Sequence, residues 1–241
     1  MIVPYKSLRK LGLFSPMRWR EKLRRDLLRV LRDITAPSSE QPDALGALEL
    51  MTIVLEDRRF FKHFGIDWRS VLREVGRALT FRAHGGFSTI DMQFVRTATG
   101  FRQRTIGRKL HEIVLAIALQ FYCDKQTILK SYLACAYFGS GLIGANAAAR
   151  KMFGKDADQL DLQEGAVIAA MLAAPRPLNA APKWEARVRR RAEYGVSVLH
   201  TNNQRLTHRY NMGISKVAEI LPRGRAASSN LRNWRQTLRT P

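Results

Sequence analysis

The chain has only two cysteines, Cys123 and Cys135, and neither stands in a Cys-x-x-Cys pair or near a histidine at zinc-ligand spacing. We therefore expect buried free thiols rather than a metal knuckle. The sequence contains no run of about 18 apolar residues. Its N-terminus also lacks the apolar core and the small-residue cleavage site of a signal peptide. These absences predict that no segment visible in this sequence spans a membrane.

Acidic residues are scarce as well. The chain carries 20 Asp and Glu against 41 Lys and Arg, so its formal net charge is +21. Such an excess is larger than solubility requires and predicts an anionic partner: nucleic acid, an anionic membrane surface or a phosphorylated substrate. Charge alone does not distinguish these partners, so its position along the chain has to decide. A hydrophobic content of 46% predicts a packed protein rather than a disordered one.

Basic residues are dense in the first 35 residues, which hold ten Lys or Arg and three acidic residues. Apolar residues recur there at helical spacing, namely Trp19, Leu23, Leu27, Val30 and Ile34. The pattern indicates a basic amphipathic helix, which fits either an interfacial anchor on anionic lipid or a helix docked on the domain. Pro, Ser and Asp interrupt the pattern over residues 36–44. Residues 1–44 are therefore predicted to form a basic amphipathic helix and a linker.

Residues 45–200 are predicted to form one all-α domain, because helical periodicity continues through them and no sustained period-two stretch occurs. One expected helix begins at Asp161, whose carboxylate can cap it in a box with Glu164. Residues 201–241 are rich in basic residues and have little apolar content, which predicts a disordered tail.

Another expected helix combines an apolar stripe with a charged face. The stripe consists of Ile106, Leu110, Ile113, Ile117 and Phe121. Arg108, Lys109 and Glu112 project from a different face, and their spacing allows the three side chains to converge. The group fits either surface salt bridges or a carboxylate held beside cations that grip a diphosphate.

Two other segments can carry chemistry. Glu56 follows the apolar run Leu48–Leu55, which places a carboxylate at the end of a hydrophobic helix. A general base can stand there, although a helix-end acid alone is more often a cap or a salt-bridge partner. Ser88 and Thr89 can start a helix whose N–H groups suit a phosphate, or can form an ordinary loop-to-helix junction.

Five segments in this order resemble the five motifs of glycosyltransferase family 51, the peptidoglycan glycosyltransferases. They are Glu56–Asp67, Gly86–Arg96, Arg108–Glu112, Ile128–Lys155 and Glu164–Asn179. The resemblance covers residues 48–183. Five ordered motifs at compatible spacing are far more specific than any one of them, so the resemblance favours a catalytic role for Glu56.

The resemblance implies a lysozyme-like helical glycosyltransferase domain with a head lobe and a smaller membrane-facing jaw lobe. It implies Glu56 as general base and Glu112 as a second essential carboxylate near the donor diphosphate. The residues implied for diphosphate binding are Ser88, Thr89, Gln93, Arg96, Arg108 and Lys109. The implied reaction polymerises lipid II into β-1,4-linked glycan strands, with inversion and release of the lipid diphosphate.

The same resemblance implies partners and a place for the protein. Lipid II and the nascent glycan are the expected ligands, an anionic membrane surface and cell-wall synthesis proteins are further partners, and no nucleic acid is expected. The implied location is peripheral, on the periplasmic side of the bacterial inner membrane. The chemistry requires no cofactor.

Asp91 and Met92 depart from the family pattern, in which Ser or Thr and a second Gln are usual. Asp91 adds negative charge beside the expected diphosphate, which predicts either weaker substrate binding or a compensating divalent cation, Mg²⁺ or Mn²⁺, at Asp91. Gln120 replaces a more usual Glu and is interpreted as structural drift. Two alternatives stay open: a catalytically weakened family member, and a basic helical membrane- or nucleic-acid-binding protein without enzymatic activity.

Overall fold

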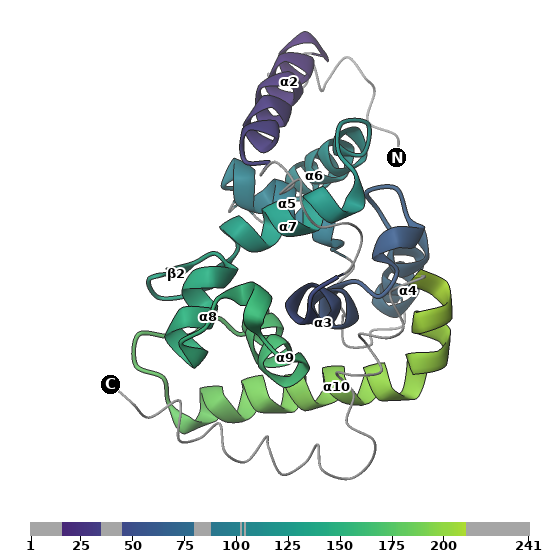
Figure 1. The fold of residues 1–241 in the computed structure, drawn as a ribbon. Coiled ribbons are helices and arrows are strands. Elements are labelled where there is room, and N and C mark those ends of the chain that lie inside the picture. Colours follow the sequence, from purple (N-terminus) through teal and green to yellow (C-terminus); the bar gives the residue numbers. More distant parts are fainter. Residues whose placement is uncertain (1–15, 35–44, 80–87, 102, 104, 211–241) are drawn as a thin grey trace. The chain divides into compact units, whose positions relative to one another are not determined.

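The computed structural model describes residues 16–34, 45–79, 88–101, 103 and 105–210 (Figure 1). The α-helices of these residues are α2 (Pro16–Arg32), α3 (Ala47–Glu56), α4 (Trp68–Leu79), α5 (Ile90–Thr99), α6 (Ile106–Leu119), α7 (Lys125–Cys135), α8 (Ala145–Phe153), α9 (Leu162–Met171) and α10 (Pro182–Tyr210). The described residues also contain two short 3-10 helices, η1 (Phe60–Lys62) and η2 (Ala157–Gln159). Two short strands, β1 (Tyr137–Gly139) and β2 (Leu142–Ile143), form an antiparallel pair. The predicted all-α class is confirmed, with this hairpin as a small addition.

The chain forms two compact units. Unit 1 contains the described residues of 16–34 and 62–128, and unit 2, the larger, contains those of 45–61 and 129–210. None of the helices in this part of the chain is both long and apolar enough to cross a bilayer. The predicted linker at 36–44 and the tail from residue 211 lie outside the described residues.

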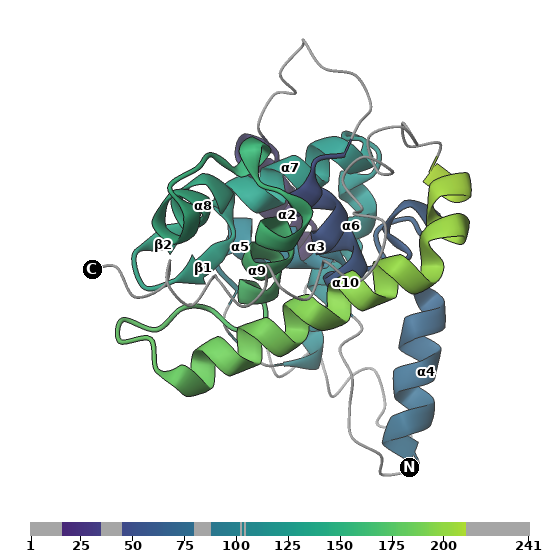
Figure 2. The same ribbon diagram turned by 60° about the horizontal axis from the view of Figure 1, so that its bottom comes forward.

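Unit 2 is built around α3, which is buried on nearly all sides. Its buried residues are Leu48, Leu50, Met51, Thr52, Ile53 and Val54. A helix that is apolar all round belongs in the interior, and α9 and α10 both pack against α3 (Figure 2). The Asp161 carboxylate accepts hydrogen bonds of 2.8 Å from the backbone N–H groups of Gln163 and Glu164 at the start of α9. Because Glu164 in turn accepts from the Asp161 N–H at 3.0 Å, the predicted capping box is confirmed.

The long helix α10 corrects the predicted end of the domain. It begins at Pro182, where the missing N–H of proline costs nothing because a first-turn N–H has no helical partner. It continues to Tyr210, so residues 201–210, predicted as the start of a disordered tail, are helical. The physical reason is local, because no proline or glycine follows Gly195 within the helix.

In unit 1, α2 packs against α5 and α6. Val30 of the predicted stripe is fully buried, and Trp19 at its other end is 38% exposed. The structure therefore shows α2 as a helix docked on its own unit, which was one of the two interpretations of its sequence. Its arginines at positions 18, 20, 24 and 25 lie on the exposed side.

The helix α6 buries its charged face and exposes much of its apolar stripe. Ile106, Leu110 and Phe121 are 82%, 58% and 75% exposed. His111 and Glu112 are buried together with Leu115, Ala116 and Leu119. An amphipathic helix ordinarily turns its apolar stripe to the core. Apolar residues and polar partners on the buried side therefore share in holding α6 in this orientation.

The two cysteines are free, as predicted, but both are half-buried rather than fully buried. Burial raises the pKa of the Cys123 thiol, and the neighbouring Asp124 carboxylate raises it further. The Cys123 thiol is thereby not activated as a nucleophile, because the thiolate is the reactive form.

Gly165 permits the close approach of α9 to α3. A Cβ atom at this position would lie 3.0 Å from the carbonyl carbon of Ala47 and 3.0 Å from the amide nitrogen of Leu48. We expect Gly165→Ala to lower the free energy of unfolding by about 1–3 kcal/mol, because backbone atoms of α3 would have to shift.

The matched control is Gly76→Ala in α4, where an added Cβ would meet nothing within 4 Å. It should raise the stability of the helix by roughly 0.5–1 kcal/mol. Urea unfolding followed by circular dichroism measures both variants. A Gly165→Ala protein as stable as the parent would contradict the packing described for α3 and α9.

Candidate active site

In unit 2, the candidate catalytic residue Glu56 is the last residue of α3. An Arg191 Nη2 atom on α10 donates a hydrogen bond of 2.7 Å to Glu56 Oε1 and one of 3.1 Å to the Leu55 carbonyl oxygen. The side chain of Glu56 is 13% exposed. One guanidinium therefore contacts both the helix end and the carboxylate, and it limits the rotation of that carboxylate.

Arg191 was not identified from the sequence. It stands 135 residues after Glu56, in a helix that also carries Arg187, Arg189 and Arg190. Helical periodicity places these arginines on different faces. Which of them meets Glu56 depends on the packing of α10 against α3, and no local signal in the sequence distinguishes it.

In unit 1, the other predicted site residues lie on α5, just before it, and on α6. Thr89 is the N-cap of α5: its hydroxyl accepts from the Met92 N–H at 3.3 Å and donates to the Gly65 carbonyl oxygen at 2.7 Å. Gly65 has a positive φ of 76°, and a Cβ there would lie 2.5 Å from the Ala116 carbonyl oxygen. Thr89 and Gly65 thus join the segment before α4 to α5, next to α6.

Glu112 is the centre of a cationic cluster on α6, and its side chain is 1% exposed. Arg108 forms an ion pair with Glu112 Oε1, and Lys109 Nζ lies 3.5 Å from Glu112 Oε2. Lys109 also donates a hydrogen bond of 2.7 Å to Ser88 Oγ. The predicted convergence of these side chains is confirmed, and it joins α6 to the residue before the Thr89 cap.

The charge of this cluster is positive. Burial lowers the pKa of the Lys109 ammonium, Glu112 raises it, and the positive charges of Arg96 and Arg108 lower it further. Arg96 on α5 is therefore close enough to repel Lys109. Arg108 and Lys109 share one buried carboxylate and Arg96 lies close to Lys109, which leaves the cluster able to attract an anion.

Gln93 is buried on α5, one turn before the exposed Arg96. The structure thus brings Arg108 and Lys109 to Glu112 and places Ser88 and Arg96 near Lys109, and Thr89 and Gln93 lie at the start of the adjoining helix. Diphosphate binding by these six side chains stays a prediction. Glu56 belongs to the other unit.

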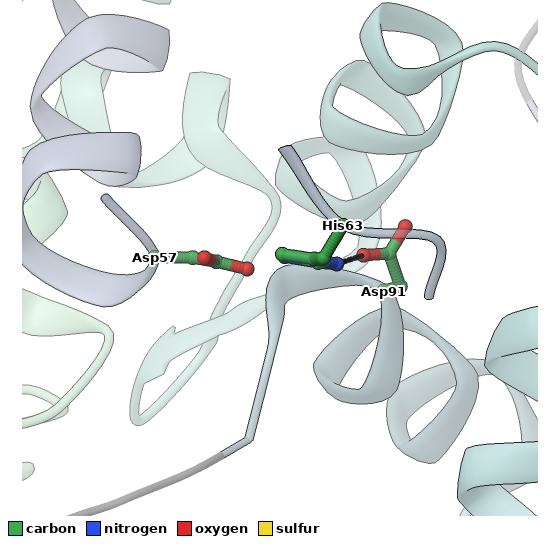
Figure 3. A group of neighbouring side chains, drawn as sticks. All are labelled: Asp57, His63 and Asp91. Atoms are coloured by element: carbon green, nitrogen blue, oxygen red, sulfur yellow. Dashed lines mark ion pairs between the residues drawn. The ribbon is translucent and has the colours of Figure 1, made fainter. Parts of the chain in front are cut away.

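Asp91, the departure from the family pattern, is fully buried in the first turn of α5. Lys125 Nζ donates to both of its carboxylate oxygens, at 3.0 and 2.8 Å. Gln120 Nε2 donates to Oδ1 at 2.6 Å, and His63 Nδ1 lies 3.8 Å from Oδ2. Figure 3 shows the His63 ring directed toward Asp91; Asp57, also labelled there, belongs to unit 2.

These contacts change the interpretation of two residues. The ammonium of Lys125 and the N-terminal end of the α5 dipole neutralise the charge that Asp91 introduces. Gln120, interpreted as drift, is a hydrogen-bond donor to Asp91. The sequence offered no sign of either contact, because Lys125 stands 34 residues and Gln120 29 residues from Asp91.

We expect Lys125→Met to lower the free energy of unfolding by about 3–5 kcal/mol, because it leaves a buried carboxylate without its cation. Adding Asp91→Asn to Lys125→Met should recover most of this loss, since the buried charge is then gone. Urea unfolding at pH 7 measures the single and the double variant.

Lys155→Met is the control, because its partner Glu164 forms an ion pair in which the lysine side chain is 44% exposed. A change well under about 1 kcal/mol is expected there. If Lys125→Met were no more costly than Lys155→Met, Lys125 would not be the ion that neutralises Asp91.

Comparison with known proteins places this geometry in context. Residues 32–199 match the family model described as Transglycosylase. The chain is 40% identical over 131 residues to Penicillin-binding protein 1A of Aquifex aeolicus, which covers 53% of this chain and 18% of that protein.

Two shorter proteins are also similar to this chain. Biosynthetic peptidoglycan transglycosylase of Shewanella denitrificans is 36% identical over 129 residues, 54% of this chain and 56% of that protein. Biosynthetic peptidoglycan transglycosylase of Vibrio parahaemolyticus is 30% identical over 171 residues, 66% of this chain and 76% of that protein. The chain thus spans from less than a fifth to about three quarters of the length of the relatives it matches.

Proposed function

Because this chain belongs to the transglycosylase family, we propose that it is a peptidoglycan glycosyltransferase that polymerises lipid II into β-1,4-linked glycan strands. The observation that carries the proposal is the buried Glu112 with Arg108 and Lys109, which contact it, and Arg96, which lies close to Lys109. A glycosyl donor activated by a lipid diphosphate needs such cations where its leaving group departs. Relatives named biosynthetic peptidoglycan transglycosylase support the same reaction class.

In the proposed reaction Glu56 is the general base. Its carboxylate takes the proton of the acceptor sugar's 4-hydroxyl while that oxygen attacks the anomeric carbon of the donor. The bond from the anomeric carbon to the diphosphate breaks, and the diphosphate departs with the electron pair. A single displacement of this kind inverts the configuration at the anomeric carbon. Arg191 orients the carboxylate through the hydrogen bond to Oε1.

The cluster in unit 1 stabilises the departing diphosphate. Arg96, Arg108 and Lys109 face the charge that develops on the leaving group, so it need not be protonated. Glu112 holds Arg108 and Lys109 in place through its ion pairs, and Ser88 adds a second contact to Lys109. Thr89 and Gln93 complete the site we propose, at the start of α5.

We propose that the reaction needs no divalent cation at Asp91. Lys125 already bonds both carboxylate oxygens of Asp91, and Gln120 bonds one of them. The negative charge that suggested an Mg²⁺ or Mn²⁺ ligand is therefore balanced within unit 1. The same contacts favour an active enzyme over a weakened one, because Asp91 does not oppose the diphosphate with a free charge.

We expect Glu56→Gln to lower kcat for polymerisation of detergent-solubilised lipid II by about 10²–10⁴-fold, because an amide cannot take the proton. Arg191→Gln should lower kcat by a smaller factor, on the order of 10²-fold or less, because the base is kept but loses its orientation. Glycan product measured on gels and rates measured with labelled lipid II test both variants.

Glu193→Gln, an exposed acid on α10 close to Arg191, is the matched control and should polymerise at the parent rate. Circular dichroism shows whether each variant keeps its fold. Polymerisation by Glu56→Gln at the parent rate would remove Glu56 as the base.

We further propose that unit 1 contacts the periplasmic surface of the bacterial inner membrane, where lipid II is anchored. Exposed apolar side chains of this unit are Phe64, Trp68, Leu72, Ile106, Leu110 and Phe121. Phe64 and Phe121 pack edge to face with ring centroids 5.1 Å apart. Exposed aromatic and aliphatic side chains in a strongly basic protein suit the interface of anionic lipid. The nascent glycan and cell-wall synthesis proteins are the other proposed partners.

Leu110→Asp should weaken binding to vesicles that contain anionic lipid roughly ten-fold, since a buried apolar contact is replaced by a charge of the same sign as the lipid. Vesicle flotation measures the bound fraction. Ile143→Asp is the control, because Ile143 is an exposed apolar residue of unit 2. Equal loss of binding in the two variants would mean that charge, and not the apolar side chains of unit 1, governs the contact.

A further inference from the structure

The helix α2 is almost entirely outside the segment that matches the transglycosylase family. The match begins at residue 32, and α2 ends at Arg32. Yet α2 packs against α5 and α6, the two helices that carry Arg96, Arg108 and Glu112. An element added before the family segment therefore supports the cationic cluster.

The contact between α2 and α6 is a buried polar pair. His111 Nε2 lies 2.9 Å from Asp26 Oδ2, and the two side chains are 6% and 5% exposed. Asp26 also accepts hydrogen bonds from Lys22 at 2.8 Å and Arg29 at 3.4 Å, both on α2. Burial is the largest influence on the pKa of His111 and lowers it overall, so the ring is neutral at pH 7 and its Nε2–H donates to the Asp26 carboxylate.

Aromatic side chains enclose this pair. Trp19 meets the His111 ring edge-on, with centroids 6.3 Å apart, and the Phe101 ring lies 5.5 Å from it. Lys22 Nζ lies 4.6 Å from the Phe101 ring centroid. Residues one turn apart on α2, Trp19, Lys22 and Asp26, thus converge on His111 and on Phe101, which follows α5. His111 is held on three sides.

The inner face of α2 fits His111 better than it fits lipid. Asp26 lies on the same side of the helix as Val30, which is fully buried. An ionised carboxylate within an apolar stripe is costly to insert into a bilayer. The buried position of Asp26 is understandable if this side of α2 packs on α6, because the His111 N–H there donates to the carboxylate.

The buried side of α6 is partly apolar and partly polar. Leu115, Ala116 and Leu119 are buried on it together with His111 and Glu112, while Ile106 and Leu110 are exposed, so a rotation of α6 would bring Glu112 toward solvent. His111 is the residue next to Glu112 and shares its buried side. A hydrogen bond from α2 to His111 opposes that rotation.

We propose that α2 is a strap that holds α6 in its catalytic orientation, with Asp26 and His111 as positioning residues for the Arg108, Lys109 and Glu112 cluster. The proposal rests on the proposed function for the reaction it serves. In this proposal, Asp26 and His111 contact neither the substrate nor the reacting atoms. They act through the direction in which α6 presents its cations.

The test is a double-mutant cycle on Asp26→Ala and His111→Ala. If the pair acts as one unit, each single variant should lower kcat about ten-fold or more, and the double variant should be no worse than either single. Asp26→Asn, which keeps an oxygen to accept the His111 N–H, should recover part of the rate. Glu21→Ala, an exposed acid on α2, is the matched control and should be unchanged.

Two further measurements do not depend on catalytic activity, and both use the full chain. Hydrogen exchange at the amides of α6 should speed up in Asp26→Ala and His111→Ala but not in Glu21→Ala. Affinity for inorganic pyrophosphate should fall in the same two variants. If the parent chain fails to polymerise lipid II, the proposed function fails, while these two measurements still decide whether α2 restrains α6.

The pH dependence of stability is a further test, and the pKa shifts of Asp26 and His111 determine its direction. The pKa of His111 is below its ordinary 6.5 because of burial and the Lys22 charge, opposed by Asp26 and Glu112. The pKa of Asp26 is also lowered from 3.8: burial raises it, but the hydrogen bonds and charges of Lys22 and His111 outweigh burial, and Arg29 also contacts it. The unfolded chain therefore takes up a proton at residue 111 first, so the strap is fully stable above pH 6.5 and weakens as the pH falls.

Between pH 7.5 and 5, the free energy of unfolding should decrease more in the parent chain than in His111→Phe. A parent and a His111→Phe protein with the same pH dependence, or α6 exchange and pyrophosphate affinity unchanged in both alanine variants, would overturn the strap. Should Asp26→Ala fail to fold, His111→Ala carries the comparison by itself. Parent-like α6 exchange, kcat and pyrophosphate affinity in His111→Ala would then count against the proposal.

Discussion

The burial of Glu112 among cations is the constraint on which unit 1 depends. A carboxylate with 1% of its side chain exposed is tolerated only when opposite charges and hydrogen-bond donors surround it. Arg108 and Lys109 supply that environment from the same helix, and Ser88 and Arg96 approach from the start of α5 and its last turn. To keep these groups together, α6 must expose Ile106 and Leu110, which leaves apolar surface available for lipid. One buried charge thereby links the proposed diphosphate site to the proposed membrane contact.

In unit 2 as well, a carboxylate at a helix is held by a cation, here at the end of α3. The centre of unit 2, α3, is apolar all round and buries itself between α9 and α10. Its last residue is Glu56, and Arg191 contacts this carboxylate at the point where the helix ends. A rigid hydrophobic helix therefore carries the proposed base, and its neighbour α10 supplies the cation that orients it.

Carboxylates that are buried or nearly so recur in this protein with a polar partner from a distant segment. Asp91 meets Lys125, Asp26 meets His111, and Glu56 meets Arg191. Each pair involves a helix that carries proposed site residues, namely α5, α6 and α3. Asp91 shows the compensation most clearly, because a charge that is unusual beside a diphosphate site is balanced by Lys125 inside the unit. The residue that departs from the family pattern thus bonds Lys125 and Gln120 within unit 1.

The sequence alone determined what depends on local order and spacing. The succession of motifs indicated the family, helical periodicity indicated the all-α class, and the four-residue spacing of Arg108 and Glu112 was enough to predict their ion pair. The Asp161 capping box was equally local. Only the tertiary structure decided that α6 turns its apolar stripe outward, that α2 docks on its own unit, and that Arg191 is the arginine at Glu56. The partners in these contacts are 85 residues apart for Asp26 and His111 and 135 for Glu56 and Arg191. Helix periodicity says which residues share a face, but the packing of whole helices chooses which faces meet.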